Sequence, residues 1–361
     1  MSTIVKQTAT KRIEYIDALR GFTMILVVLL HIEMYSFELS KSFVMYNLFS
    51  IFRMPLFFFV SGFISYKANI AWTKQTWWTM SKKKLMIQLL PTLFFGLIYA
   101  YTHYHVGFTT FIGHLWKYGY WFTFVLFEMF IILYTLNLLL YNSDSKTFQK
   151  RQIVSLILLS IIFFGVSLIL GKFPNKLNDI FTLVYVCRFF PYFAFGIICS
   201  MNKERFHKVL QNKWFYIAII ILFCIGFCLC QYISPKLGGN VIITLSYSII
   251  NKLVSLMGLL IVYNCFRVYQ NSFVSTKKVG KALQYIGKRT LDIYLIHWFL
   301  LPYLPQIGEL LSASSKIYNN VVLELVIVGG FSLIVIAVCL IVSNILRTSP
   351  ILAKYLFGAK E

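Results

Sequence analysis

The sequence predicts an all-α, polytopic integral membrane protein. Three observations support this fold class: few charges, repeated long apolar runs and an uneven distribution of cations. Of 361 residues, 59% are hydrophobic and only 13% are charged, whereas a soluble domain carries about 25% charged residues. Apolar runs of about twenty residues, each sufficient to cross a ~30 Å hydrocarbon core, recur along the chain. We therefore expect one transmembrane domain over 1–361.

The apolar runs predict ten membrane spans joined by mostly short connections. The first fourteen residues are polar, and no small-residue cleavage site follows the first apolar run, so we expect a retained span rather than a signal peptide. The ten expected spans are 15–36, 45–66, 85–105, 120–141, 152–171, 180–200, 214–232, 241–266, 285–304 and 320–343.

The distribution of cations predicts the orientation of these spans. Most of the 34 Lys and Arg residues lie on alternate connections and at both ends of the chain. Cytoplasmic loops of membrane proteins collect Lys and Arg, so both termini are expected in the cytoplasm, with short tails at 1–14 and 344–361. The net charge of +22 then reflects topology and contact with membrane lipids, and it requires no nucleic acid.

Neither the cysteines nor the loop histidines indicate a metal site. The seven Cys residues lie in or beside apolar spans without a C-x-x-C pair, as buried, inert thiols do. His103, His105 and His114 have no acidic neighbours in sequence that would complete a metal site. Their aromatic segment, which starts at Tyr101, is either an interfacial loop or a rim that stacks on sugar rings.

The first span carries the most informative ionisable residues, because such groups are costly inside a membrane unless they are paired or functional. Arg20 and His31 are eleven residues apart, which puts them within about 20° of one helix face and roughly 16 Å apart along the axis. Asp17 lies one turn before Arg20 and can pair with it. A donor anchored at Arg20 could therefore react near His31. Alternatively, Arg20 extends to the interface with Asp17, and His31 bonds a neighbouring helix.

Later spans add further candidates. Arg53 precedes Pro55, which bends a helix, and it suits an oxyanion holder together with Ser61. Cavity-lining and structural roles both remain open for the other polar residues of the spans. These are Glu128, seven residues after Trp121 and on the same face; Arg188; Lys252; and His297, one turn after Tyr294. Asp292 lies about 140° from His297 on a helix, so we do not expect these two side chains to pair.

Several runs, in order, resemble the acyltransferase-3 family over nearly the whole chain. RIEYIDALRGFTMILVVLLHI, from Arg12, is similar to its first-span signature, and FRMPLFFFVSGF, from Phe52, to its next segment. GYWFTFVLFEMF, from Gly119, resembles its Trp-Phe motif. YIGKRTLDIYLIHWF, from Tyr285, resembles its late Tyr-x-x-His motif, and SPILAKYLFGAK, from Ser349, its C-terminal end.

This resemblance implies ten spans, an acyl-CoA donor on the cytoplasmic side and a glycan or other acceptor outside. The essential histidine of the family corresponds to His31 and its first-span cation to Arg20. The Arg cluster that some members carry after the second span is replaced here by Lys67, Lys74 and 82–84. No run of this sequence resembles the soluble hydrolase-like domain of many members, so we expect the membrane domain alone to handle the acceptor.

The resulting hypothesis is acyl transfer, with acetyl-CoA as the favoured donor, to a surface glycan at a bacterial inner membrane. The CoA phosphates would meet Arg12, Lys82, Lys83 and Lys84, with His31, Arg20 and Arg53 as the catalytic set. His31 would act as a general base or form an acyl-histidine. The expected substrate-binding residues are Asp17, Ser61, Trp121, Glu128, Arg188, Tyr294 and His297.

Two other classes of function fit parts of the pattern. Buried cations and broken helices also occur in transporters and flippases, here of a glycan precursor or a small anionic solute. A sensor or a structural subunit of an export complex is the third class. A homo-oligomer is compatible with each of these classes.

Overall fold

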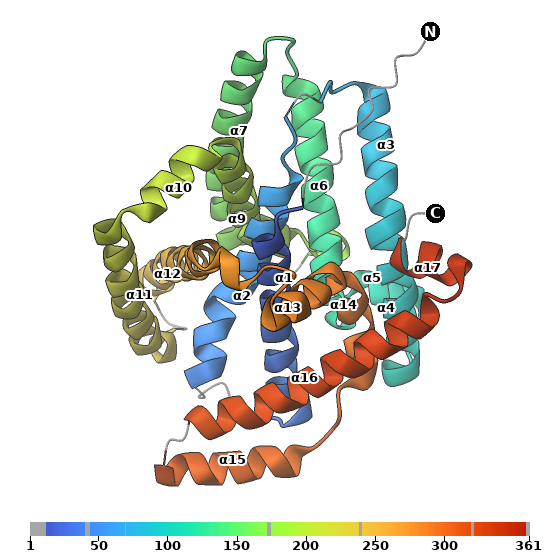
Figure 1. The fold of residues 1–361 in the computed structure, drawn as a ribbon, viewed down its shortest axis with the longest axis vertical. Coiled ribbons are helices and arrows are strands. Elements are labelled where there is room, and N and C mark those ends of the chain that lie inside the picture. Colours follow the sequence, from blue (N-terminus) through green and yellow to red (C-terminus); the bar gives the residue numbers. More distant parts are fainter. Residues whose placement is uncertain are drawn as a thin grey trace.

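A computed structural model describes residues 12–39, 44–68, 70–171, 175–237, 240–318 and 321–358. These residues form helices and connecting turns, with no strand among them (Figure 1). The predicted all-α fold class is therefore confirmed.

Nine helices or continuous helical stretches within the described residues are long and apolar enough to cross a membrane. Two of them combine several elements: α1 (Glu14–His31) continues through a π-helical turn at Ile32–Ser36, and α3 (Lys74–Lys84) continues through a second one, Leu85–Leu89, into α4 (Leu90–Tyr104). The other seven are α2 (Val44–Ser65), α6 (Trp121–Leu140), α7 (Ser145–Leu170), α9 (Leu183–Met201), α11 (Lys213–Ile233), α12 (Val241–Val268) and α16 (Val321–Leu346).

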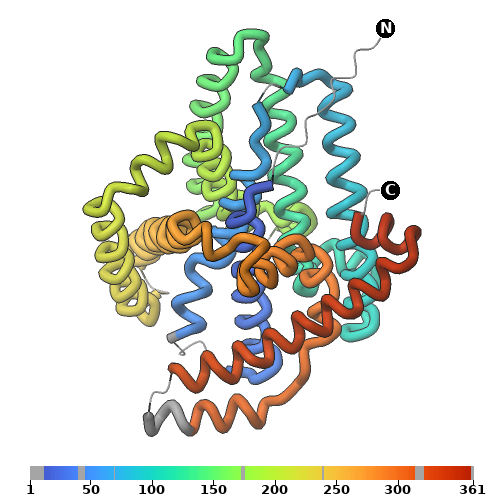
Figure 2. The backbone as a smooth tube through the Cα atoms, viewed as in Figure 1, coloured from blue at the N-terminus to red at the C-terminus, as the bar shows by residue number. Residues whose placement is uncertain are grey.

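The expected span at 285–304 is not one helix. It is divided between α13 (Lys278–Lys288) and α14 (Thr290–Leu300), with Arg289 at φ −110° and ψ 17° between them. Figure 2 shows this part of the chain changing direction at the centre of the molecule. With 11 residues, α14 is shorter than the ~20 needed for a complete crossing. The apolar run was correctly located, but its continuity was wrongly predicted.

Shorter helices complete the described chain. They are α5 (Phe108–Gly113), α8 (Lys176–Phe181), α10 (Lys203–Gln211), α15 (Pro305–Tyr318) and α17 (Pro350–Phe357), together with 3-10 turns at Lys117–Gly119, Ser234–Lys236 and Gln270–Ser272.

Helix α1 lies at the centre of the fold, where α2, α12, α13, α14 and α16 pack around it (Figure 1). Most of its side chains are buried, whereas α7 and α11 expose most of theirs. In a membrane protein, exposed apolar side chains face lipid. The polar residues of α1 therefore face the protein interior, which places them where a site can form.

Glycines bring the central helices unusually close together. A Cβ atom on Gly62 of α2 would overlap the Phe193 carbonyl of α9, and one on Gly196 would overlap the Phe59 carbonyl. Gly21 of α1 and Gly287 of α13 make a similar reciprocal contact through Leu283 and Asp17. Small residues at helix interfaces permit such backbone approach in membranes.

A buried ion-pair cluster joins α14 to α16. Asp292 accepts hydrogen bonds from Arg347 Nε at 2.8 Å and Nη2 at 2.9 Å, and Ser343 Oγ also donates to it. Arg289 forms a further ion pair with Asp292 at 3.2 Å. The Asp292 carboxylate is thus fully engaged away from His297, in agreement with the helical spacing.

Candidate functional site

A large cavity lies between α1, α2, α3, α4, α6, α9 and α14. Its volume is about 1320 Å³, above the ~300–1,000 Å³ typical of small-molecule sites. It therefore has room for more than one substrate-sized group. Arg20 and His31 both line it, as their shared helix face predicts.

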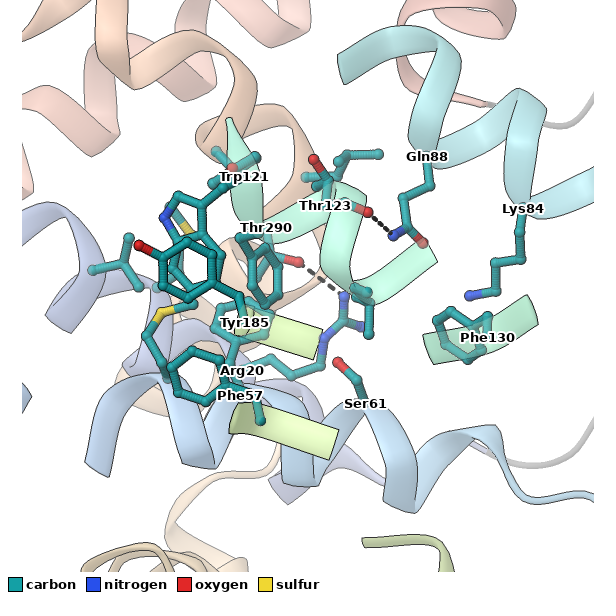
Figure 3. A pocket seen from close by; sticks show the side chains of 18 of the residues that line it. Arg20, Phe57, Ser61, Lys84, Gln88, Trp121, Thr123, Phe130, Tyr185 and Thr290 are labelled. Atoms are coloured by element: carbon teal, nitrogen blue, oxygen red, sulfur yellow. Dashed lines mark hydrogen bonds between the residues drawn. The ribbon is translucent and has the colours of Figure 1, made fainter. Parts of the chain in front are cut away.

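Partners inside the protein hold Arg20 in the cavity wall. Its Nη2 donates to Thr290 Oγ1 at 2.8 Å (Figure 3), and its Nη1 lies 3.7 Å from Asp17 Oδ1. Asp17 is buried and does not itself line the cavity. Because Thr290 is the first residue of α14, the break between α13 and α14 supplies a ligand that orients the guanidinium.

His31 pairs with His297, and the geometry assigns the proton positions. His297 Nδ1 lies 3.0 Å from the Ile293 carbonyl oxygen, which can only accept, so this nitrogen carries the proton. In the neutral ring, His297 Nε2 must then be an acceptor. It lies 2.9 Å from His31 Nδ1, which therefore donates. In this assignment, His31 Nε2 keeps a free lone pair, as a general base requires.

Aromatic rings restrict the movement of His31. The Trp298 ring lies 4.5 Å from the His31 ring, and the Tyr35 ring lies 5.9 Å from it, between centroids. His297 is completely buried and is not among the cavity-lining residues. The structure therefore places His297 behind His31, and not against a substrate.

The described residues that line the cavity include no Asp or Glu but six cations: Arg20, Arg53, Lys67, Lys83, Lys84 and Arg188. The Lys84 ammonium lies 3.5 Å from the centroid of the Phe130 ring (Figure 3). The charge of the cavity fits an anionic occupant.

Only two of the four residues expected to meet the CoA phosphates line the cavity. Lys83 and Lys84 line it, but Lys82 and Arg12 are exposed elsewhere. Successive residues of a helix point in different directions, so three consecutive lysines of α3 cannot all face one cavity. Lys82 and Arg12 could therefore act on an occupant of the cavity only from outside the cavity wall.

Arg53 and Ser61 both line the cavity from α2. Arg53 Nη1 lies 3.4 Å from the carbonyl oxygen of Val27, one turn before His31 on α1. Its Nε is buried and has no hydrogen-bond partner among the described residues. A donor with spare capacity near the histidine pair is the arrangement that oxyanion stabilisation needs.

The remaining candidates divide between cavity and interior. Trp121, Arg188 and Tyr294 line the cavity, and Tyr294 also donates to the Gly119 carbonyl at 3.1 Å. Glu128 does not line it, although it shares a helix face with Trp121; it accepts a hydrogen bond from Thr182 Oγ1 at 3.3 Å. Of the cavity-lining and structural roles that the sequence left open for Glu128, this contact matches the structural one.

Sequence reasoning missed three site residues because it surveyed ionisable groups. Thr290 and Trp298 lie within the run that contains Tyr294 and His297, and that motif was their available signal. Gln88 is a polar residue inside an otherwise apolar span, and it donates to the Thr123 carbonyl at 2.8 Å (Figure 3).

A strained loop forms part of the cavity wall. Lys117 and Tyr118 have φ of 46° and 51°, and Gly119 has φ of 102°, values that non-glycine residues seldom adopt. The Lys117 ammonium is buried and donates to the carbonyls of Ile112 and Asp179. Burial lowers the pKa of Lys117 to about 8. This anchor holds Tyr118 and Gly119 in the wall, with Trp116 beside them.

The described residues contain no cluster of three or more His, Cys, Asp or Glu side chains that could hold a metal ion.

Comparison with known proteins identifies relatives of this chain. A family profile described as an acyltransferase domain matches residues 13–343. Proteins named glucans biosynthesis protein C from Salmonella paratyphi B, Salmonella dublin and Salmonella enteritidis are each 24% identical over 250 residues. The match covers 59% of this chain and 58% of each relative, so it spans less than two thirds of the relatives' length. No solved structure matches significantly.

The profile begins one residue before α1 and ends near the end of α16, so it includes every helix that lines the cavity. The nine membrane-length helices of the described residues, the cavity between them and the histidine pair all lie inside this match. The chain therefore belongs to the acyltransferase family that this domain defines, as a multi-pass membrane protein.

Proposed function

We propose that the chain transfers an acyl group, acetyl in the favoured case, from acyl-CoA to a hydroxyl group of a glycan across a bacterial inner membrane. The observation that carries this proposal is the His31–His297 pair, in which His31 lines a cavity that is also lined by Arg20 and the lysines. Acyl-CoA is an anionic thioester, so its binding needs cations, and the acceptor hydroxyl must lose a proton, so the reaction needs a base. The same cavity supplies the cations and, in His31, the base.

The donor would enter from the lysine-rich end. Its phosphates would lie against Lys67, Lys83 and Lys84, and its pantetheine arm would extend past Arg20 toward His31. The roughly 16 Å rise between these two α1 residues corresponds to an extended arm rather than to a compact ligand. Hydrogen bonding to Thr290 fixes Arg20 without consuming all of its donors.

In the direct route, His31 Nε2 takes the proton of the acceptor hydroxyl while its oxygen attacks the thioester carbonyl. Arg53 would stabilise the oxyanion, with Ser61 on the same helix as a second candidate donor. The tetrahedral species then expels the CoA thiolate, which receives the proton from His31. In the acyl-histidine route, Nε2 attacks the thioester carbonyl and the CoA thiolate leaves; the acceptor hydroxyl then attacks the acyl-histidine, its proton passes to the thiolate, and His31 Nε2 is released. Both routes need the same free lone pair.

Transport of an anion remains the alternative, because a cavity lined by cations and no carboxylate among the described residues also fits an anion pathway. Transport would not require an orientated histidine pair, and it would consume no thioester. This difference can be measured directly.

The test uses the purified protein in lipid nanodiscs, with acetyl-CoA and a surface-glycan extract from the native host. We expect free thiol to appear together with alkali-labile ester on the glycan, and His31→Ala to abolish both. His103→Ala, which alters an exposed histidine, is the matched control. Thiol release and ester formation that persist in His31→Ala would refute the assigned chemistry. Glycan movement without thiol release would favour transport.

A further inference from the structure

We propose that Arg188, together with the rings of Trp116, Trp121 and Tyr185, forms an acceptor subsite for a sugar ring that bears an anionic group. This inference rests on the proposed function, because it assigns the acceptor end of the same cavity. It adds a substrate class: an acidic saccharide, in which a carboxylate or a phosphate supplies the charge.

The first observation is that Arg188 lies in a membrane-length helix without a counter-ion. It is exposed on the cavity wall, and its guanidinium makes no ion pair or hydrogen bond within the part of the chain that the structure describes. An ionisable residue in a span is costly unless it has a partner or a wet surface. The neighbouring cation, Lys252, does have a hydrogen-bond partner, because its Nζ donates to the Arg188 backbone carbonyl at 2.8 Å.

The second observation is the cluster of aromatic rings beside this guanidinium. The Tyr185 ring lies 5.3 Å from the Trp116 ring and 4.7 Å from the Trp121 ring, between centroids. Trp121 also stacks on Phe189 at 5.7 Å. Trp116 is half exposed, so an apolar face remains available to a ligand. Indole and phenol rings combine such faces with polar edges, which suits the C–H faces and hydroxyls of a pyranose.

The third observation is the direction of Arg188. Side chains lean toward the N-terminus of their helix, and Arg188 lies five residues after the start of α9. Its guanidinium carbon lies 6.0 Å from the Tyr185 ring centroid, on the aromatic side. Arg188 therefore serves a different part of the cavity from Lys83 and Lys84, and the donor phosphates do not account for it.

The charge of the lining decides the class of sugar. The described lining residues contain no carboxylate, so a neutral sugar would leave the Arg188 charge without a partner and an amino sugar would be repelled. A uronate or a sugar phosphate presents two oxygens, which a guanidinium can bind through two parallel hydrogen bonds. The subsite then selects the acceptor by charge and holds it by ring stacking.

The test measures binding without any acyl donor. Wild-type protein in nanodiscs is titrated with methyl glucuronide, glucose 6-phosphate and methyl glucoside by isothermal calorimetry. We expect at least one charged sugar to bind at least tenfold more tightly than methyl glucoside, and the comparison of the two identifies the anion. Arg188→Gln should remove the preference, and Arg188→Lys, which keeps the charge but not the paired hydrogen bonds, should reduce it.

Two further variants complete the test. Arg205→Gln, at an exposed arginine outside the cavity lining, should keep the full preference. Trp116→Ala should weaken all three sugars. The proposal is overturned if wild type shows no preference, if Arg188→Gln keeps it, or if Arg205→Gln loses it. Absence of the preference in wild type, with His31-dependent acyl transfer intact, would reject the subsite alone and leave the proposed function in place.

Discussion

At the residue scale, the tautomer of His31 depends on a second histidine that does not touch the cavity. The Ile293 carbonyl fixes the proton on His297, and His297 in turn fixes the proton on His31. We expect His297→Ala to lower kcat by ~10²-fold, within the range of general acid–base contributions, with little change in the KM for acyl-CoA. His297→Gln should recover part of the rate, because its amide oxygen can accept the His31 proton.

The pH profile separates positioning from structural damage. In wild type, one nitrogen of His31 is committed to His297, whereas in His297→Ala both ring nitrogens can exchange protons. We therefore expect the acidic limb of kcat against pH to shift in the variant while its thermal unfolding temperature stays close to that of wild type. An unchanged profile with a lowered unfolding temperature would mean that His297 is only structural.

Lys117 predicts a pH dependence of stability with a definite sign. Burial lowers its pKa to about 8 in the folded protein, and the nearby Glu128 and Asp179 carboxylates limit the fall. His114 also lies within electrostatic range. An unfolded lysine titrates near ~10.4, so between these values the unfolded chain holds more protons. The contribution of Lys117 to the free energy of unfolding should therefore rise with pH from about 8 to 10.

Thermal unfolding of wild type and Lys117→Met between pH 7 and 10 checks this sign. The wild-type unfolding temperature, relative to that of the variant, should increase with pH. Lys176→Met, at an exposed lysine, should follow wild type throughout. A difference that is constant or shrinks as the pH rises would contradict the burial argument.

At the element scale, close packing of α2 on α9 joins two walls of the cavity, which Arg53 and Ser61 line from α2 and Arg188 lines from α9. Gly62→Ala would push a methyl group into the Phe193 carbonyl, so we expect destabilisation of about 1–3 kcal/mol. Gly165→Ala in α7 has no atom within 4 Å of the new methyl group and should be neutral or stabilising, by about 0.5–1 kcal/mol. Urea or thermal unfolding in detergent measures both, and equal effects would refute the close contact.

The same scale shows what periodicity and hydropathy can predict. Apolar length located all ten apolar segments, and the 3.6-residue repeat correctly placed Arg20 and His31 on one face lining one cavity. Neither the apolar length nor the helical repeat predicts the break at Arg289, because Lys288, Arg289 and Asp292 could equally lie in a continuous helix. The break follows from the ion pairs of Asp292 with Arg289 and Arg347, and Arg347 lies more than fifty residues further along the chain.

At the scale of the whole molecule, the cavity joins two chemically different ends. Lys84 lies on one side of Arg20, and Trp121 and Tyr185 lie on the other (Figure 3); Lys67 and Lys83 also line the cavity, and Trp116 and Arg188 lie beside the Tyr185 ring. The distribution of cations along the sequence predicts that the lysine-rich end faces the cytoplasm. We then expect the two termini in the cytoplasm as well, and the donor and acceptor of the proposed reaction would approach from opposite sides of the membrane.

Single cysteines at the two ends test this arrangement. Starting from a variant in which the seven native Cys residues are replaced, we expect Lys83→Cys to react with a membrane-impermeant maleimide only from the cytoplasmic side. Trp116→Cys should react only from the opposite side. CoA should protect Lys83→Cys, because its phosphates would lie there, and should leave Trp116→Cys reactive. Labelling of both positions from one side would refute the orientation, whereas correct sides without CoA protection would retain the topology and refute the donor site.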